Sequence, residues 1–331
     1  MTTSSFLYPS QINLETFPFS KFNSWQAQGV SYVFIVTNVL SLIPSLLILI
    51  SVLVYKRMQT TDNMIVMQIA IIDVIYATWT IIWVSVKLST NYMVLNMTAC
   101  KVEAAISAIC KITWLYSALV CAFWRYYTIV KGENISKRGV LLLQLTQWIL
   151  PLFAGILIAV TNRFDLMPSA GYCYLAYKPD DPLLKGYYFI TIAVILIPTV
   201  LAVYFYYSIS RQFYNIMRRV NESSQSYLVD MSDEKSSYQA ISEKENLAVN
   251  PSLEKYRAVA FRSIMYCLIF ILSFLPYGVT MIYELITDTP RSDTVDFWVV
   301  SAIMIHKVLS PMVTLFINAS ILAQVKKILS L

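Results

Sequence analysis

The stretch GVSYVFIVTNVLSLIPSLLILISVLVY, residues 29–55, decides the fold, because it is long, apolar and free of charged side chains. A helix needs about 20 such residues to cross the hydrocarbon core of a bilayer. Further windows of the same kind follow along the chain and cover residues 63–87, 98–130, 140–160, 187–209, 258–285 and 296–318. The sequence therefore predicts an all-α integral membrane protein whose seven transmembrane helices form one bundle.

The composition of the whole chain fits a membrane protein and argues against other classes. Of 331 residues, 57% are apolar or aromatic and only 13% are charged, whereas a soluble domain carries about 25% charged residues. One histidine, His306, and five cysteines offer little from which to build a metal site or an enzyme. We expect no metal, no cofactor, no catalytic activity and no nucleic-acid partner, and we assign the net charge of +6 to a bias between membrane sides.

Basic residues gather on one side of the predicted membrane. If the N-terminus is outside, 16 of the 25 lysines and arginines are cytoplasmic, seven are on the other side, and Lys111 and Lys307 lie within spans. The positive-inside rule then places the N-terminus outside and the C-terminus inside. We expect a multi-pass protein of the plasma membrane.

This topology divides the chain into three parts. Residues 1–28 form an extracellular N-terminal segment, residues 29–319 form the transmembrane domain, and residues 320–331 form a short cytoplasmic tail. Within the domain, residues 219–255 are rich in serine and in charges of both signs. Such a composition cannot bury enough apolar surface to fold, so we expect a disordered third cytoplasmic loop.

Residues within and beside the spans form a pattern of order and spacing. Asp73 closes the apolar run IAIID ten residues after Asn63, and Cys100 opens the third span 25 residues before Arg125. The remaining marks are Trp124 and Tyr126 on either side of Arg125, Trp148, Pro198 with Tyr206, the run SFLPY that contains Pro276, and the run SPMVT that begins with Ser310 and Pro311. In this order the chain resembles the rhodopsin-like class of G-protein-coupled receptors over nearly its whole length, as a divergent member.

The chain departs from the family pattern at positions that concern switching. Ser45 stands for the first-helix asparagine, Trp124 for the acid before the arginine, Phe274 for the sixth-helix tryptophan and Thr314 for the last tyrosine. In the family that acid restrains the arginine at rest, so its loss should favour the active state. The resemblance implies that coupling and switching involve Trp124, Arg125, Tyr126, Tyr206, Arg257, Pro276, Ser310 and Pro311.

The outer side carries two candidate covalent features. Cys100 and Cys173 both fall outside, where disulfides form and persist, and the resemblance implies that they are bonded to each other. Asn96 begins an Asn-Met-Thr triplet, which is a glycosylation acceptor pattern. We expect a disulfide and a glycan at these positions.

Ionisable residues inside the spans are Asp73, Lys111 and Lys307. Each costs about 2.5–3.5 kcal/mol at a helix centre, so each needs a partner or a use. Asp73 and Lys307 lie at nearly the same depth, and the family usually holds a sodium ion at this aspartate. We expect an intramembrane charge pair in which the Lys307 ammonium replaces that ion, either as a helix staple or as part of the activation switch.

The resemblance implies a ligand cavity in the outer half of the bundle. Its expected lining is Trp83, Glu103, Ser107, Lys111, Phe274, Tyr277, Met281 and Met304. An aromatic, apolar cavity with one cation suits an apolar ligand that bears an acid. Lys111 could instead approach Glu103 or share Asp73, and both alternatives stay open.

The function predicted from these features is that of a G-protein-coupled receptor. It would bind an extracellular ligand in its outer half and activate a heterotrimeric G protein at its cytoplasmic face. One alternative is a retinal-binding photoreceptor, although Lys307 stands four residues before Pro311 and animal opsins place their lysine seven before. The other is a seven-helix transporter or channel that uses the intramembrane charges as an ion path.

Overall fold

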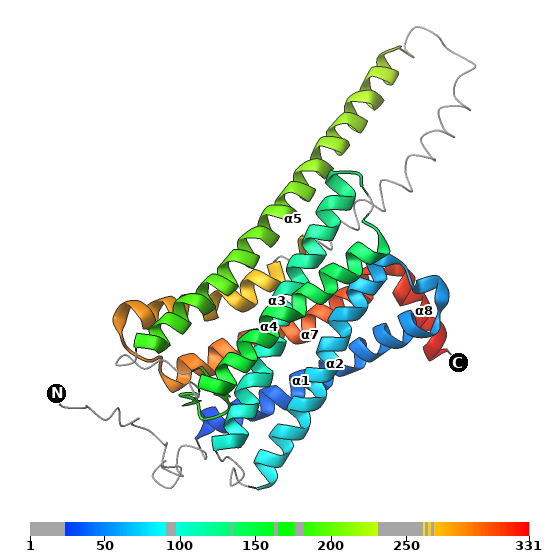
Figure 1. Ribbon diagram of the computed structural model, residues 1–331. Coiled ribbons are helices and arrows are strands. Elements are labelled where there is room, and N and C mark those ends of the chain that lie inside the picture. The colour runs from blue at the N-terminus through cyan, green and yellow to red at the C-terminus, as the bar shows by residue number, and fades with distance from the viewer. Residues whose placement is uncertain are drawn as a thin grey trace, which may run out of the picture.

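The computed structural model describes residues 24–90, 97–133, 135–161, 165–175, 182–230, 261, 264–265 and 268–330. Seven of the described helices are long and apolar enough to cross a membrane, which confirms the predicted bundle (Figure 1). They are α1 (Trp25–Val54), α2 (Thr61–Ser89), α3 (Met97–Val130), α4 (Lys137–Thr161), α5 (Pro182–Asp230), the sixth span (Leu268–Thr287) and α7 (Asp293–Ile317).

Short elements join or follow these helices. A turn of 3-10 helix, η2 (Lys56–Met58), lies between α1 and α2, and α8 (Ala319–Leu329) follows α7. The strands β1 (Asp165–Leu166) and β2 (Cys173–Tyr174) pair antiparallel between α4 and α5. We call the end of the bundle that carries these strands the hairpin end, and the opposite end the α8 end.

Several helices begin where a polar side chain can accept a hydrogen bond from the first turn. Ser24 accepts from the backbone of Ala27, and Ser292 accepts from that of Val295. Asn318 both ends α7 and caps α8, where its side chain accepts from Ile321 N. Capping satisfies backbone donors that the helix leaves without partners, so these residues fix the helix boundaries.

The outer surface of the bundle is apolar where lipid would cover it. Leu142, Ile149 and Phe153 of α4 are more than 60% exposed, and so is Leu272 of the sixth span. Helices satisfy their own backbone hydrogen bonds, which makes such a surface compatible with hydrocarbon. The chain is therefore a membrane protein.

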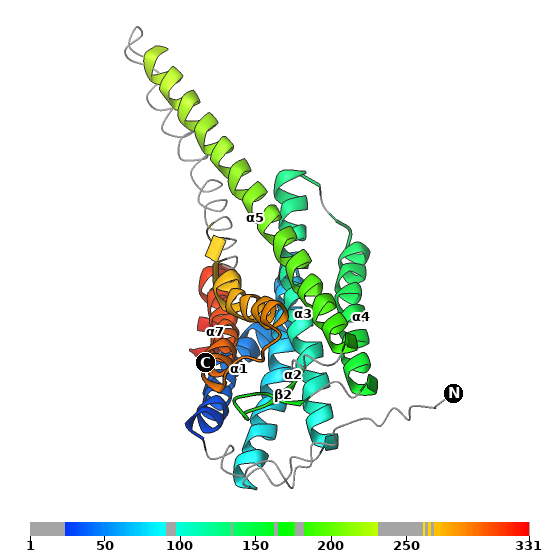
Figure 2. The same ribbon diagram turned by 90° about the vertical axis from the view of Figure 1, so that its left-hand side faces the viewer.

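α3 is the central helix and packs against α2, α4, α5 and the hairpin (Figures 1 and 2). Its contact with α4 depends on Gly155, because a Cβ there would lie 2.3 Å from Cγ1 of Ile109 and 3.1 Å from the carbonyl oxygen of Ala105. Small residues let helices approach closely in membranes. This approach holds α3 deep in the bundle.

α5 is longer than the sequence led us to expect. It continues to Asp230 and projects beyond its neighbours at the α8 end (Figure 1). Residues 219–230, which we expected in a disordered loop, are helical, because extending an existing helix avoids the unfavourable nucleation step. The rest of that loop lies outside the described residues, as do residues 1–23.

α8 packs back onto the bundle through one face. Ile321 and Val325 are buried in a cluster with Ile48 of α1 and Val66 of α2. The side chain of Asn318 also donates to that of Asn63 at 3.2 Å. These contacts tie the α8 end of α7 to the start of α2.

Candidate functional site

The hairpin end of the bundle is closed by residues 165–175. Met167, Ala170, Tyr172, Cys173 and Leu175 are all buried. A disulfide of 2.06 Å joins Cys173 to Cys100 at the start of α3, which confirms the predicted bond. The loop thus forms a lid that is anchored covalently to the central helix.

The lid reaches as far as α1. A Cβ at Gly171 would lie 2.5 Å from Cγ1 of Val30, and the ring of Tyr172 lies 5.8 Å from that of Phe34. Glycine is required at position 171 for this close approach. The lid therefore spans the bundle from α3 to α1.

One buried ion pair clamps the lid to α2 and α3. The ammonium of Lys87 lies 3.0 Å from Oε1 of Glu103, and the two side chains are 1% and 4% exposed. Lys87 also donates to the carbonyl oxygen of Gly171 at 2.9 Å, and Glu103 accepts from the backbone nitrogen of Cys173 at 3.2 Å. We call these four groups the α3 clamp.

A second buried carboxylate clamps the lid to α7. Asp296, at 0% exposure, accepts from the backbone nitrogen and the hydroxyl of Ser169 at 3.2 and 2.6 Å. It also accepts from the Tyr172 hydroxyl and from Nε of Arg291, both at 2.9 Å. Charge-assisted hydrogen bonds are about twice as strong as neutral ones, so this α7 clamp holds the lid firmly.

Glu284 of the sixth span extends the α7 clamp. Its Oε1 accepts from the backbone nitrogen of Arg291 at 2.9 Å, and its Oε2 accepts from the Tyr188 hydroxyl at 3.4 Å. The guanidinium of Arg291 lies 3.8 Å from the same carboxylate. The clamp thereby links α5, the sixth span and α7 at the hairpin end.

Lys111 is half-buried beneath the lid and points at two of its aromatic rings. Its ammonium lies 4.2 Å from the ring centre of Tyr174 and 5.2 Å from that of Tyr172. Burial, followed by the negative charge of Asp296, holds the pKa of Tyr172 well above its ordinary value, and burial raises the pKa of Tyr174 to about 12. Both phenols are therefore neutral, and they attract Lys111 through their ring faces.

Most of the expected cavity residues meet under the lid. Phe274, Tyr277 and Met281 of the sixth span and Met304 of α7 are buried in one cluster, which also contains Met167, Tyr172 and Tyr174. Tyr174 and Tyr277 pack edge to face at 6.5 Å. The ammonium of Lys111 is therefore a positive charge surrounded mainly by aromatic side chains.

The other expected cavity residues have different positions. Glu103 belongs to the α3 clamp, and Ser107 is buried one turn from Lys111 on α3. Trp83 stacks on Trp79 at 5.5 Å. Lys87, Arg291 and Asp296 were not recognised as site residues from the sequence, because charges at span ends look like loop charges until a partner faces them.

The two charges in the bundle centre lie near each other without direct contact. Asp73 and Lys307 attract each other electrostatically, but among the described residues no hydrogen bond joins them. Lys307 instead donates to the side-chain oxygen of Asn38, and its ammonium lies 3.9 Å from the ring centre of Tyr76. Asp73 accepts from the Ser45 hydroxyl at 3.5 Å.

The α8 end holds the residues expected to switch. Arg125 is 3% exposed, and Trp124 packs in an apolar cluster with Ile65 and Val140. Tyr126 lies 5.0 Å from the ring of Phe205, and Tyr206 is buried against α3. Pro276 is half-buried in the sixth span, and Ser310 and Pro311 are buried in α7. Arg257 and Asn96 lie outside the described residues.

A bundle of seven apolar helices, with a disulfide-anchored lid at one end and a buried arginine at the other, is the architecture of a heptahelical membrane protein. The family model described as 7 transmembrane receptor (rhodopsin family) matches residues 44–314. The chain therefore belongs to the rhodopsin family of G-protein-coupled receptors.

Individual proteins resemble the chain at low sequence identity. The melatonin receptor type 1B of Rattus norvegicus is 25% identical over 155 residues, which span 47% of this chain and 41% of that receptor. The crystal structure of squid rhodopsin has a TM-score of 0.69 at 14% identity and covers 91% of this chain and 84% of its own. The second likeness establishes the fold, and the first spans less than half of the relative.

The α3 clamp makes a prediction about stability. Lys87→Met leaves Glu103 buried without its cation, which costs about 3–5 kcal/mol for a broken buried pair. Adding Glu103→Gln to Lys87→Met should recover part of the loss, because the amide keeps an acceptor for Cys173 and carries no charge. The measurement is the thermal unfolding midpoint of purified receptor.

The control for this pair is Lys185→Met. Lys185 pairs with Asp288 at 2.6 Å at the same end of the bundle, but the two side chains are 33% and 54% exposed, and exposed pairs contribute about 0–1 kcal/mol. If Lys87→Met lowered the midpoint no more than Lys185→Met does, the α3 clamp would not be structural.

The central charges make a prediction about sodium. Because Lys307 already supplies a positive charge near Asp73, the unfolding midpoint of wild type should be equal in sodium chloride and in choline chloride. Lys307→Met leaves the buried carboxylate without a cation, so its midpoint should fall in choline and recover with sodium. The double variant Lys307→Met/Asp73→Asn should lose that response, and an equal sodium response in wild type would contradict the prediction.

Proposed function

We propose that the protein is a plasma-membrane receptor that binds an extracellular ligand under the lid and activates a heterotrimeric G protein at the α8 end. Membership of the rhodopsin family supports both partners in general terms. The observation that carries the ligand proposal is the position of Lys111 beneath Tyr172 and Tyr174. In this proposal the hairpin end binds the ligand and the α8 end contacts the G protein.

Two features support the orientation. Disulfides persist on the extracellular side, and the Cys100–Cys173 bond lies at the hairpin end. Lysines and arginines gather on the cytoplasmic side, and Lys326 and Lys327 lie in the last turn of α8. The lid therefore faces outside and α8 lies on the inner side of the membrane.

The surroundings of Lys111 favour a ligand with an acidic group and an apolar body. A cation over a ring gains about 0.5–2 kcal/mol, whereas a hydrogen bond between two charged groups gains more. A carboxylate that reaches Lys111 thus competes well against the tyrosine rings. The apolar body would pack on Phe274, Met281 and Met304, which are buried in the same cluster.

The lid couples this site to its surroundings. The hydroxyl of Tyr172 is held by Asp296 while its ring faces Lys111. A ligand that displaces the ring also pulls on the α7 clamp, which includes Glu284 of the sixth span through Arg291. Movement of the sixth span about Pro276, which cannot donate a backbone hydrogen bond, would then open the α8 end beside Arg125.

The missing acid beside Arg125 makes a prediction about basal activity. Trp124 supplies none of the restraint that an acid at its position would give, so we expect more nucleotide exchange without agonist than in a variant that carries that acid. Trp124→Asp should lower this basal exchange about fivefold or more, since a charge-assisted contact is worth about 1 kcal/mol or more. Arg125→Ala should abolish it in membranes that contain full-length receptor and each class of heterotrimeric G protein.

The control is Ile75→Ala, because Ile75 is 51% exposed on the lipid-facing side of α2. Trp124→Phe separates loss of the aromatic contact in the apolar cluster from gain of the acid. Exchange in wild-type membranes that equals exchange in receptor-free membranes, at equal surface expression of all variants, would contradict the coupling proposal.

The proposed ligand chemistry can be tested with acids and their esters. Decanoic acid, oleic acid and indole-3-acetic acid are compared with their methyl esters for the shift that each causes in the unfolding midpoint of purified receptor. We expect an acid to stabilise wild type more than its ester does, and Lys111→Met to remove the difference while Lys111→Arg retains it. Equal shifts by acids and esters across the panel would refute recognition of an acid.

A further inference from the structure

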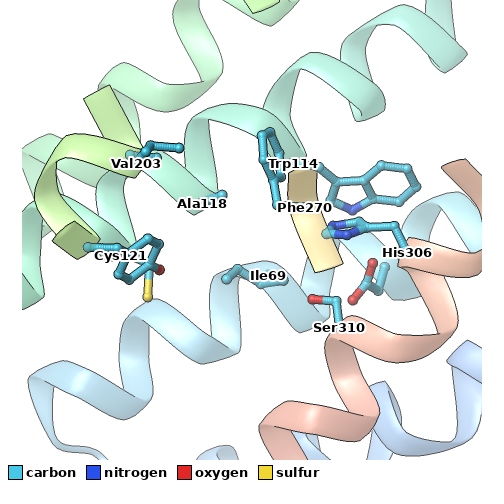
Figure 3. A pocket seen from close by; sticks show the side chains of 11 residues that line it. Ile69, Trp114, Ala118, Cys121, Val203, Phe270, His306 and Ser310 are labelled. Atoms are coloured by element: carbon cyan, nitrogen blue, oxygen red, sulfur yellow. The ribbon is translucent and has the colours of Figure 1, made fainter. Parts of the chain in front are cut away.

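A cavity separate from the Lys111 site lies closer to the α8 end, between α2, α3, α5, the sixth span and α7 (Figure 3). The space that protein atoms leave empty there is about 620 Å³, which includes open solvent at the mouth of the cavity. Its wall is mainly apolar and includes Ile69, Ala118, Val203 and Phe270. Neither the lid nor its clamps contribute to this wall.

One end of the cavity is polar. His306 and Ser310 of α7 and the indole of Trp114 lie together there, and Asp73 completes the lining (Figure 3). His306 is 92% buried, and its ring packs edge-on against Phe270 and Phe274 at 5.9 and 5.4 Å. These two rings hold the imidazole in one orientation.

One buried nitrogen atom at this end, Nδ1 of His306, has no hydrogen-bond partner among the described residues. The indole nitrogen of Trp114 instead faces the carboxylate of Asp73. A buried polar group without a partner is costly, and native proteins normally supply one. His306 lines the cavity, so a molecule inside it is the natural source of that partner.

The charges around the polar end select the kind of molecule. Asp73 is already balanced by the nearby Lys307 and by polar contacts with Ser45 and Trp114. A further cation or anion would enter an apolar cavity without a counter-charge, which is strongly unfavourable. A neutral hydrogen-bonding group meets His306 without that cost.

We propose that this cavity binds a neutral small molecule whose aromatic or hydrocarbon body lies against Ile69, Ala118, Val203 and Phe270, and whose single hydroxyl or amide group is hydrogen bonded to His306. Val203 is 37% exposed on a membrane-spanning helix. The cavity is therefore accessible from the bilayer, in which such molecules dissolve, without displacement of the lid.

Occupancy would act on the helices that border the cavity. Tyr206 of α5 and Cys121 of α3 also line it, and Cys121 packs in the same cluster as Trp124. A bound molecule would hold α3, α5 and the sixth span at one spacing. The site is thus suited to a modulator that acts independently of the ligand under the lid.

The test uses purified full-length receptor and small probes that share one ring. Benzyl alcohol should raise the unfolding midpoint by about 2–4 °C at about five times its Kd. Toluene should raise it less, because it has no hydrogen-bonding group, and benzylamine and benzoate at neutral pH should not raise it. His306→Leu should reduce the benzyl alcohol shift to that of toluene.

A filled cavity provides the matched control. Ala118→Leu places a larger side chain in the wall and should abolish the shift, whereas Val102→Leu adds bulk on the lipid-facing side of the same helix and should leave it intact. Ile69→Phe fills the cavity from α2 if Ala118→Leu does not reach the membrane. The test does not involve signalling, so its outcome is independent of the function proposed above.

Several outcomes would overturn the proposal. They are the absence of any shift in wild type, a full shift retained in both cavity-filling variants, and equal shifts by benzyl alcohol and toluene in wild type. A benzyl alcohol shift that is lost in the filled variants and reduced in His306→Leu supports it.

Discussion

The structure depends on four buried carboxylates, each of which needs hydrogen-bonding or charged partners because water does not reach it. Asp73, Glu103, Glu284 and Asp296 are each at most 3% exposed, and a buried charge is tolerated only when it is paired and hydrogen bonded. Each of them is met by groups from another part of the chain, so each connects elements that apolar packing alone would leave free to slide. Three of the four lie at the hairpin end, so buried polar contacts cross-link the lid, α2, α3, α5, the sixth span and α7 there.

α3 carries the successive layers of the molecule along its length. From the hairpin end it presents Cys100 and Glu103 to the lid, then Lys111 to the lid tyrosines, then Trp114 to the central charges, and finally Arg125 at the α8 end. The close approach at Gly155 keeps this helix packed against α4 along the way. Events at either end therefore act on one continuous helix.

The sequence predicted what depends on local pattern. Apolar windows predicted the seven helices, and the family resemblance predicted the Cys100–Cys173 bond, because both are visible in residue type and spacing. The clamps could not be predicted in the same way. Lys87 and Arg291 looked like solvated charges at span ends, and only the folded lid brings Gly171 and Asp296 to them. Likewise, depth along the chain suggested a Lys307–Asp73 pair, but depth does not fix direction, and Lys307 turns to Asn38.

The two clamps also impose an order on biosynthesis. Ser169 and Asp296 are 127 positions apart, and Lys87 and Gly171 are 84 apart. When the ribosome has made the loop, α2 and α3 already exist, so the disulfide and the α3 clamp can form at once. The α7 clamp must wait until the last span has been inserted. In a nascent chain that stalls before α7, the lid is bound to α2 and α3 but not to α7. Cellular quality control could use this difference to distinguish an unfinished receptor from a complete one.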